Sequence, residues 1–201
     1  MPDRNKKALP IGNVNFKQII AEDSYYVDKT EMIRDIIDYK IPVSLFTRPR
    51  RFGKTLNMDM IRTFFEKTEQ DNSVYFKNLK IWQYGEEYTS EQGKYPVIYF
   101  SFKEIKCLEW KSTCESLLGF ITEEFCRHME VAGSGDEYEN SLFERIVHSE
   151  GSLTDYEKSL RVLSKMLAKY YNTQVIIIID EYDTPIVSGY TNDFFPKIVS
   201  L

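Results

Sequence analysis

The residues best suited to chemistry lie in the stretch "RPRRFGKTL", where Gly53, Lys54 and Thr55 follow one another directly. A glycine lets the backbone approach a phosphate closely, a lysine brings a compact positive charge, and a threonine hydroxyl can reach a magnesium ion. This is how a phosphate-binding loop ends. Its first position, five residues before Gly53, is normally glycine but here is Arg48. A chance tripeptide on a surface turn is therefore the alternative interpretation.

A second candidate group is the acidic pair Asp180 and Glu181, which follows four consecutive isoleucines in "VIIIIDEYD". An aspartate at the end of a buried strand can hold magnesium, and a glutamate just beyond it can orient and deprotonate a water molecule. A single acidic pair is more often a solvated turn. Two halves of one site, each at the end of its own apolar run, favour nucleotide binding.

The elements around these groups have the order that such a site needs. Three apolar runs predict buried strands, at residues 41–47 ("IPVSLFT"), 95–102 ("YPVIYFSF") and 174–180 ("QVIIIID"). Apolar residues at helical spacing predict helices over 16–20, 31–39 and 54–68, and after Ser112, Ser141 and Thr154. Capping-box spacing is present for Asp28 with Glu31, Ser112 with Glu115, and Thr154 with Glu157. The stretch "SYYVD" predicts a short strand. Strands alternating with helices imply an α/β fold with a mostly parallel sheet covered on both faces.

Three arginines precede the loop, and two interpretations of them stay open. Arg48, Arg50 and Arg51 could replace the glycine contacts by donating to the phosphates, or they could form a basic, solvated loop edge. A similar alternative applies to Asp183, which either supports a magnesium ion or starts a turn. His128 and His148 have no partner at ligand spacing, so we interpret them as surface or capping groups.

Bulk properties exclude several classes of protein. The chain has 201 residues, 42% apolar and 28% charged, which is typical of one soluble domain or one domain with a small appendage. A net charge of −5 argues against a globally basic nucleic-acid binder. No apolar run approaches a membrane span, and the polar N-terminus lacks a signal core, so we expect a cytoplasmic protein. Three cysteines without CxxC spacing exclude a common zinc or redox motif.

Five segments together resemble the AAA-ATPase-like proteins of gut and anaerobic bacteria. They are "LPIGNVNF", "YYVDKTEMI", "RPRRFGKTL", "YPVIYFSF" and "IIIIDEYDTP", in that order, and they cover nearly the whole chain. The resemblance implies a P-loop NTPase-like sheet of the additional-strand type, flanked by helices. It also implies ATP and Mg²⁺ as ligands, with Lys54 and Thr55 on the phosphates and magnesium, Asp180 on magnesium, and Glu181 as the catalytic base.

The resemblance also implies that the core is incomplete. Members often continue into a PD-(D/E)XK-type nuclease domain, which nothing here matches, and they place a strand with a polar sensor residue between the two site strands. Only 20 residues follow Glu181, and Pro196 disfavours a central strand there. We therefore expect residues 1–40 to form a lead-in (helix, short strand, helix) and residues 41–201 to form a partial ATPase core, either as a fragment or as a shortened relative.

Two functions follow as hypotheses. The first is a magnesium-dependent NTPase whose turnover changes the conformation of a protein partner or of a missing C-terminal domain. The second is a truncated, non-hydrolysing interaction or inhibitor protein that acts on a protein or nucleic-acid machine. A nucleic-acid-dependent ATPase is supported only by the arginine cluster, and no membrane partner is expected.

Overall fold

The computed structural model describes residues 7–47 and 52–199. The chain divides into two compact units, Met1–Tyr95 and Pro96–Leu201, and each is described by itself. Arg48, Arg50 and Arg51, the three arginines of the predicted loop, lie outside the described residues.

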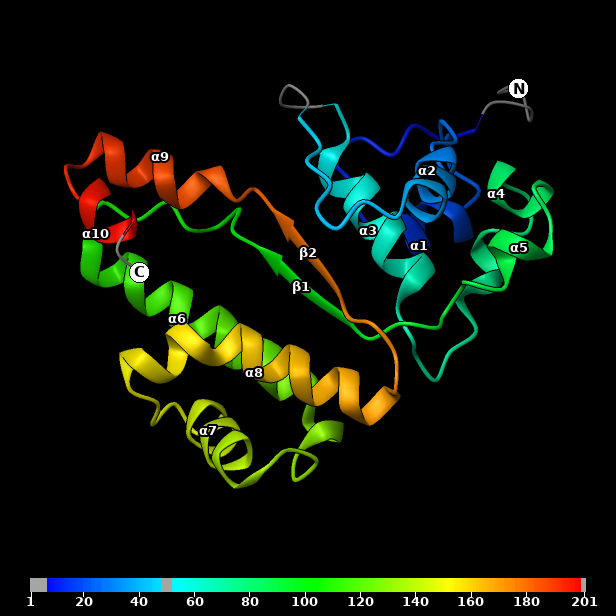
Figure 1. The fold of residues 1–201 in the computed structure, drawn as a ribbon. Coiled ribbons are helices and arrows are strands. Elements are labelled where there is room, and N and C mark those ends of the chain that lie inside the picture. Colours follow the sequence, from blue (N-terminus) through cyan, green and yellow to red (C-terminus); the bar gives the residue numbers. More distant parts are fainter. Residues whose placement is uncertain (1–6, 48–51, 200–201) are drawn as a thin grey trace. The chain divides into compact units, whose positions relative to one another are not determined.

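Short helices packed around aromatic side chains make up the first unit (Figure 1). Its elements are α1 (Phe16–Ala21), α2 (Glu31–Tyr39), α3 (Lys54–Phe65), the 3₁₀ turn η1 (Asn72–Tyr75), α4 (Lys80–Gln83) and α5 (Glu86–Thr89). Phe16 of α1 and Phe64 of α3 are fully buried, and each packs on the ring of Phe76, with centroids 5.0 and 5.2 Å away. This aromatic cluster fixes the body of α3, whose N-terminus carries the candidate phosphate loop.

The capping-box spacing predicts Asp28 as the N-cap residue of α2, but the N-cap is Thr30. Asp28 instead ties the start of α2 to α4. Its carboxylate accepts hydrogen bonds from the backbone N–H groups of Thr30, at 2.9 Å, and Lys80, at 2.7 Å. Thr30 in turn accepts from the N–H of Ile81 at 3.1 Å. One carboxylate thus orders the starts of two helices that lie about fifty residues apart in the sequence.

The strand predicted at residues 41–47 does not form, so that prediction is wrong. The segment runs without regular structure, and Val43 and Leu45 are 82% and 66% exposed. A strand needs a neighbour to complete its hydrogen bonds, and the described part of the first unit contains no strand. The short strand predicted at "SYYVD" is absent for the same reason.

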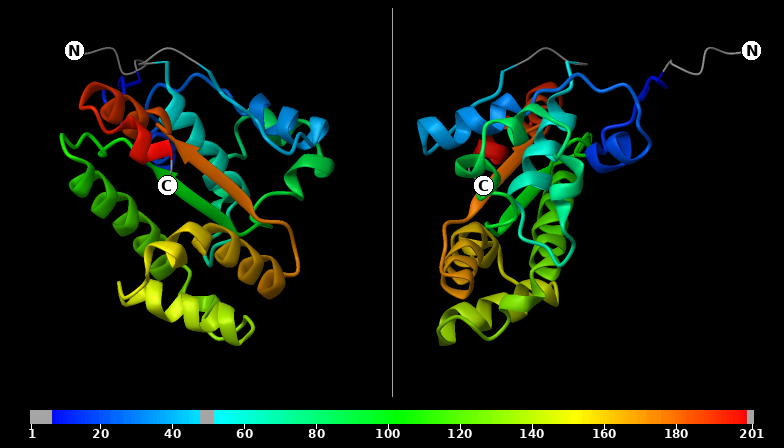
Figure 2. Two further views of the ribbon diagram at one scale, coloured as in Figure 1. Left: turned by 60° about the vertical axis from the view of Figure 1, so that its left-hand side comes forward. Right: turned by 90° about the vertical axis from the view of Figure 1, so that its right-hand side faces the viewer.

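Two parallel strands and a helical layer make up the second unit (Figures 1 and 2). Its elements are β1 (Val97–Ser101), α6 (Trp110–Arg127), the 3₁₀ turn η2 (Met129–Val131), α7 (Glu137–Val147), α8 (Leu153–Tyr171), β2 (Ile176–Asp180), α9 (Asp183–Thr191) and α10 (Phe195–Val199). The strands predicted near 95–102 and 174–180 are thereby confirmed. The described fold is α/β, with a smaller parallel sheet than the sequence predicts.

The hydrophobic core of the second unit lies between β1 and the helices α6, α7 and α8. Ile98 and Phe100 of β1 pack in one cluster with Phe125, Leu142 and Met166 from these three helices. Pro196 disfavours a central strand near the C-terminus, and the segment around it folds as helix α10.

Both capping-box positions that the sequence suggests in this unit are displaced. Helix α6 begins at Trp110 rather than at a cap formed by Ser112. Helix α8 is capped by Ser152 with Asp155, not by Thr154 with Glu157. Both Ser152 and Thr154 are followed three residues later by an acidic residue, as a capping box requires. The cap at Ser152 is favoured because its acidic partner, Asp155, is also held by an ion pair with Arg145, with N–O distances of 2.8 and 3.1 Å.

Candidate functional site

The first candidate group is the turn that starts helix α3. Gly53 is the N-cap residue and has left-handed backbone angles, φ 74° and ψ 25°. Its carbonyl accepts the first helical hydrogen bond, from the N–H of Asn57 at 2.9 Å. No side chain caps the helix, so the N–H groups before Asn57 are left available at the positive end of the helix dipole. The glycine predicted from the motif therefore lies where an anion would be favoured.

Lys54 and Thr55 occupy the first two positions of α3, and both are partly exposed. Neither side chain forms a hydrogen bond or ion pair with the residues that the structure describes. An ammonium group and a hydroxyl group without protein partners, next to open backbone N–H groups, are suited to contact a polyphosphate and its cation.

Asp59, which sequence reasoning missed, holds this helix in place. Its carboxylate accepts a hydrogen bond from the N–H of Phe16 at 2.7 Å, which joins α3 to the start of α1. Burial raises the pKa of Asp59, and the bond from Phe16 opposes this effect. An aspartate one helical turn after Thr55 gives no motif, so the sequence offered no signal for this role.

The second candidate group is the end of strand β2. Asp180, its last residue, is only 3% exposed. One carboxylate oxygen, Oδ1, accepts a hydrogen bond from the N–H of Glu181 at 3.1 Å. The other, Oδ2, is buried and has no hydrogen-bond partner among the described residues. Buried polar atoms are almost always satisfied, so this oxygen has the capacity to accept from water, a ligand or a group outside the described residues, as do the buried Asn72 Oδ1 and Ser134 Oγ.

Glu181 adds a second unusual feature at the same point. It has φ 54°, a left-handed backbone that is uncommon for residues other than glycine and costs about 1 kcal/mol or more. Asp183 begins helix α9 and is exposed. The strand end therefore combines an unsatisfied buried carboxylate with a strained glutamate.

Glu124 and Arg127 of α6, with its C-cap residue His128, close the outer edge of β1. Glu124 accepts from the N–H of Tyr99 at 2.8 Å, and both Arg127 and His128 donate to the carbonyl of Val97. Parallel pairing directs the backbone groups of alternate residues away from β2, so these side chains occupy the place of a neighbouring strand. The sheet of this unit consequently has one closed edge.

Glu124 and Arg127 are also directly paired, at 2.6 and 2.9 Å. Burial alone would raise the pKa of Glu124, but hydrogen bonds from Arg127 and His128 outweigh it and lower the pKa to about 2. Burial alone would lower the pKa of His128. Its hydrogen bonds to Glu124 and Glu130 have the opposite effect and are stronger together, so the pKa is raised. His128 is thus a buried edge-closing group and not a surface one. The i, i+3, i+4 spacing of the three residues on one helix face was the signal available in the sequence.

The outer edge of β2 differs from that of β1. Ile177 and Ile179 are 43% and 41% exposed, and their backbone groups point away from β1. No hydrogen bond joins those groups to another residue in the described part of the chain. A two-stranded parallel sheet with one closed and one open edge can extend only at the open edge.

The structure thus brings Gly53, Lys54 and Thr55 together at one helix N-terminus, and Asp180 and Glu181 together at one strand end. The two groups belong to different units. Among the described residues, no three His, Cys, Asp or Glu side chains form a cluster for a metal ion. Magnesium in nucleotide sites is held by one or two protein oxygens with phosphates and water, so the absence of such a cluster is compatible with a nucleotide site. None of the described helices has the length and apolar character needed to cross a membrane.

Comparisons with known proteins identify the family of the chain. The chain is similar to a curated protein of Azotobacter chroococcum mcd 1, "Uncharacterized protein in vnfD 5'region", with 26% identity over 197 residues. The match covers 93% of this chain and 31% of that protein, so the chain spans about a third of its relative's length. No solved structure matches the chain. A family model described as "AAA-ATPase_like: Predicted AAA-ATPase" matches residues 10–199. The chain therefore belongs to the AAA-ATPase-like family.

Proposed function

We propose that this protein binds ATP as its magnesium complex and hydrolyses it, and that turnover changes the conformation of a protein partner or of a further domain. In this proposal Lys54 and Thr55 act on the phosphates and the magnesium ion, and Asp180 and Glu181 act on the magnesium ion and the attacking water. Membership in a family described as AAA-ATPases supports nucleotide binding in general.

The observation that carries the proposal is the buried Oδ2 of Asp180, which has no hydrogen-bond partner among the described residues. Leaving such an atom unsatisfied costs about 1–3 kcal/mol, and more for a charged group. A cation, or a water molecule held by one, would satisfy it. The left-handed backbone of the adjacent Glu181 also supports a functional site here, because strained backbone angles cluster at functional sites.

Each residue has a defined role in the proposed reaction. The open N–H groups after Gly53 and the ammonium group of Lys54 would bind and orient the phosphates, and Arg48, Arg50 and Arg51 are further candidates for phosphate contacts. Thr55 and Asp180 would hold the magnesium ion, which when bound neutralises charge that develops on the phosphates. Glu181 would accept a proton from the attacking water.

Two substitutions test the proposal in the full chain. Lys54→Ala should abolish ATP binding, because it removes the positive charge at the phosphates. Glu181→Gln should keep binding and lose hydrolysis, because the amide cannot accept the proton. Binding is measured by calorimetry with Mg²⁺ and ATP, and hydrolysis by release of radiolabelled phosphate. Lys67→Ala, which removes an exposed lysine beyond the end of α3, is the matched control and should change neither. Equal ATP affinity in the Lys54 variant and the wild type would refute the phosphate-site assignment.

A further inference from the structure

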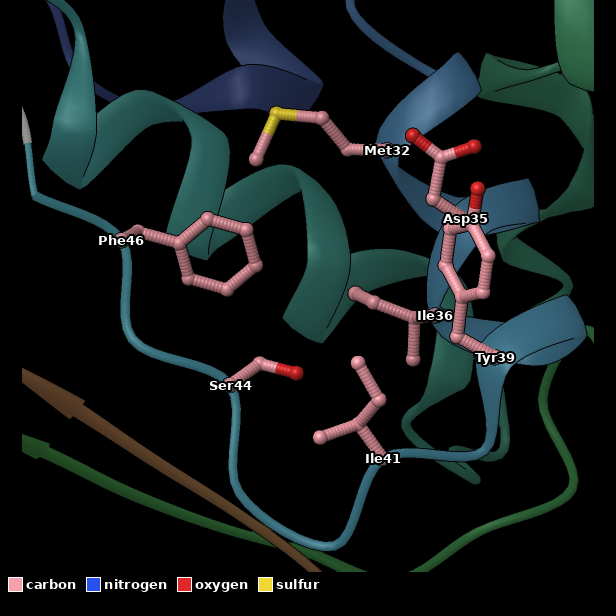
Figure 3. A pocket seen from close by; sticks show the side chains of 7 residues that line it. All are labelled: Met32, Asp35, Ile36, Tyr39, Ile41, Ser44 and Phe46. Carbon is pink, nitrogen blue, oxygen red and sulfur yellow. The ribbon is translucent and has the colours of Figure 1, made fainter.

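A cavity of about 180 Å³ lies in the first unit, between α2 and the segment 41–47 that leads toward the phosphate loop (Figure 3). Helix α2 contributes side chains at i, i+3, i+4 and i+7, which form a single face. The lining residues are Met32, Asp35, Ile36, Tyr39, Ile41, Ser44 and Phe46. The proposed phosphate and metal contacts involve none of them.

The walls of this cavity are mainly apolar. The side chains of Ile36, Ile41 and Phe46 point into the space, and Met32 borders it from the end nearest α3 (Figure 3). Tyr39 and Ile41 are 70% and 57% exposed, so the cavity is open to solvent and is not an enclosed void. Its volume of about 180 Å³ is comparable to the roughly 150 Å³ that holds a benzene molecule in an enclosed apolar cavity, so a flat aromatic ring system is of suitable size to pack against its walls.

Two polar groups border the apolar walls. The carboxylate of Asp35 accepts a long hydrogen bond, 3.4 Å, from the guanidinium of Arg34, and retains the capacity to accept others. The hydroxyl of Ser44 points toward the cavity (Figure 3). Apolar walls with few polar groups are typical of small-molecule sites, and a carboxylate selects ligands that donate N–H groups.

The cavity also lies on the chain segment that enters the phosphate loop. Only six residues separate Phe46 from Gly53, so the two are at most about 25 Å apart even if the chain is fully extended. This also accounts for the unpaired segment 41–47, since its inward side chains line a cavity instead of a sheet.

We propose that this cavity binds the base of the nucleotide: a purine that carries an exocyclic amino group. The ring packs between the apolar side chains and against Phe46, and the amino group donates to the carboxylate of Asp35. This inference rests on the proposed nucleotide function and adds the site that selects the base. Adenine and guanine share the required amino group, whereas hypoxanthine, the base of ITP, lacks it.

The test is calorimetric titration of the full chain with ATP, GTP, ITP and inorganic tripolyphosphate, each with Mg²⁺. The wild type should bind ATP or GTP about fivefold or more tightly than ITP, from the strength of one charge-assisted hydrogen bond at a partly exposed site. Asp35→Ala should remove this preference. Phe46→Ala should weaken ATP binding about tenfold, from the loss of base stacking. Neither variant should change the affinity for tripolyphosphate, which has no base.

Matched controls separate the cavity from general effects. Glu69→Ala removes an exposed carboxylate, and Tyr25→Ala removes an exposed ring, both in the same unit and outside the cavity, so neither should alter any affinity. The ratio of ATP to GTP affinity identifies which base the cavity prefers. Unchanged ATP and ITP affinities in both cavity variants, with Lys54→Ala losing ATP and tripolyphosphate alike, would overturn the base site alone. A wild type that binds neither ATP nor tripolyphosphate would overturn the proposed function as well.

Discussion

Replacing Asp180 by asparagine should make the ligand-free protein more stable and the liganded protein less stable. In the wild type, Oδ1 of Asp180 accepts from the N–H of Glu181, while Oδ2 is buried without a hydrogen-bond partner among the described residues. Asparagine has the same shape and keeps an oxygen for the Glu181 bond. It replaces the unsatisfied carboxylate oxygen with a neutral amide group, so the cost of burying charge disappears.

The expected magnitude follows from that unsatisfied atom. A buried polar atom without a partner costs about 1–3 kcal/mol, and part of this cost remains with the amide. The free energy of unfolding should therefore rise by about 1 kcal/mol, which corresponds to about 2–4 °C in Tm for a chain of this size. With Mg·ATP at a hundred times its Kd, linkage stabilises the wild type by about 2.7 kcal/mol, whereas the variant gains much less. The variant should therefore be the more stable protein without ligand, and the wild type the more stable protein with Mg·ATP.

Urea denaturation, followed by tryptophan fluorescence with and without Mg·ATP, measures both effects. Asp183→Asn is the matched control, because Asp183 is exposed in the first turn of α9. It should show no gain, and instead a loss of a few tenths of a kcal/mol at the helix N-terminus. An Asp180→Asn protein that is less stable than the wild type without ligand would refute the reasoning, since Oδ2 would then be making a stabilising contact.

Two further predictions concern the stability of each unit. Gly53→Ala should lower the free energy of unfolding by about 1 kcal/mol, because a residue with a Cβ is strained at φ 74° even though the space around it is open. Thermal unfolding measures this loss, and an unchanged Tm would contradict the left-handed conformation of the cap residue. Glu124→Gln should cost up to about 3 kcal/mol at pH 7, since the pKa of Glu124 falls from 4.5 to about 2 on folding. A lowered pKa stabilises the fold above about pH 4.5, and the contribution disappears as the pH falls toward 2. Urea midpoints of wild type and variant should therefore converge in acid, and a constant difference would contradict the ionic role of Glu124.

Local patterns predicted the elements around the candidate site well. The helix after Gly53 and the strand before Glu181 are specified by their own sequences, through helical spacing in one case and a run of isoleucines in the other. The capping preference of glycine and the buried position of Asp180 follow from the same patterns. These are short-range properties, and a single sequence carries them.

Long-range pairing could not be predicted in the same way. Residues 41–47 have the composition of a buried strand, yet hydrogen-bond partners for a strand come from elsewhere in the chain, and the described part of their unit offers none. The closed edge of β1 depends on Glu124, Arg127 and His128 reaching a strand about 25–30 residues earlier. Neither effect is visible in a local window of sequence.

The most direct test of the central claim is a double-mutant cycle on Mg·ATP binding with Thr55→Ala and Asp180→Asn, measured in the full chain by calorimetry. If Thr55 and Asp180 act on the same magnesium ion of the bound nucleotide, the double variant should lose little more affinity than the worse single variant, with a coupling of about 1 kcal/mol or more. Losses that add within about 0.5 kcal/mol, or an Asp180 variant that binds Mg·ATP as tightly as the wild type, would contradict a shared site.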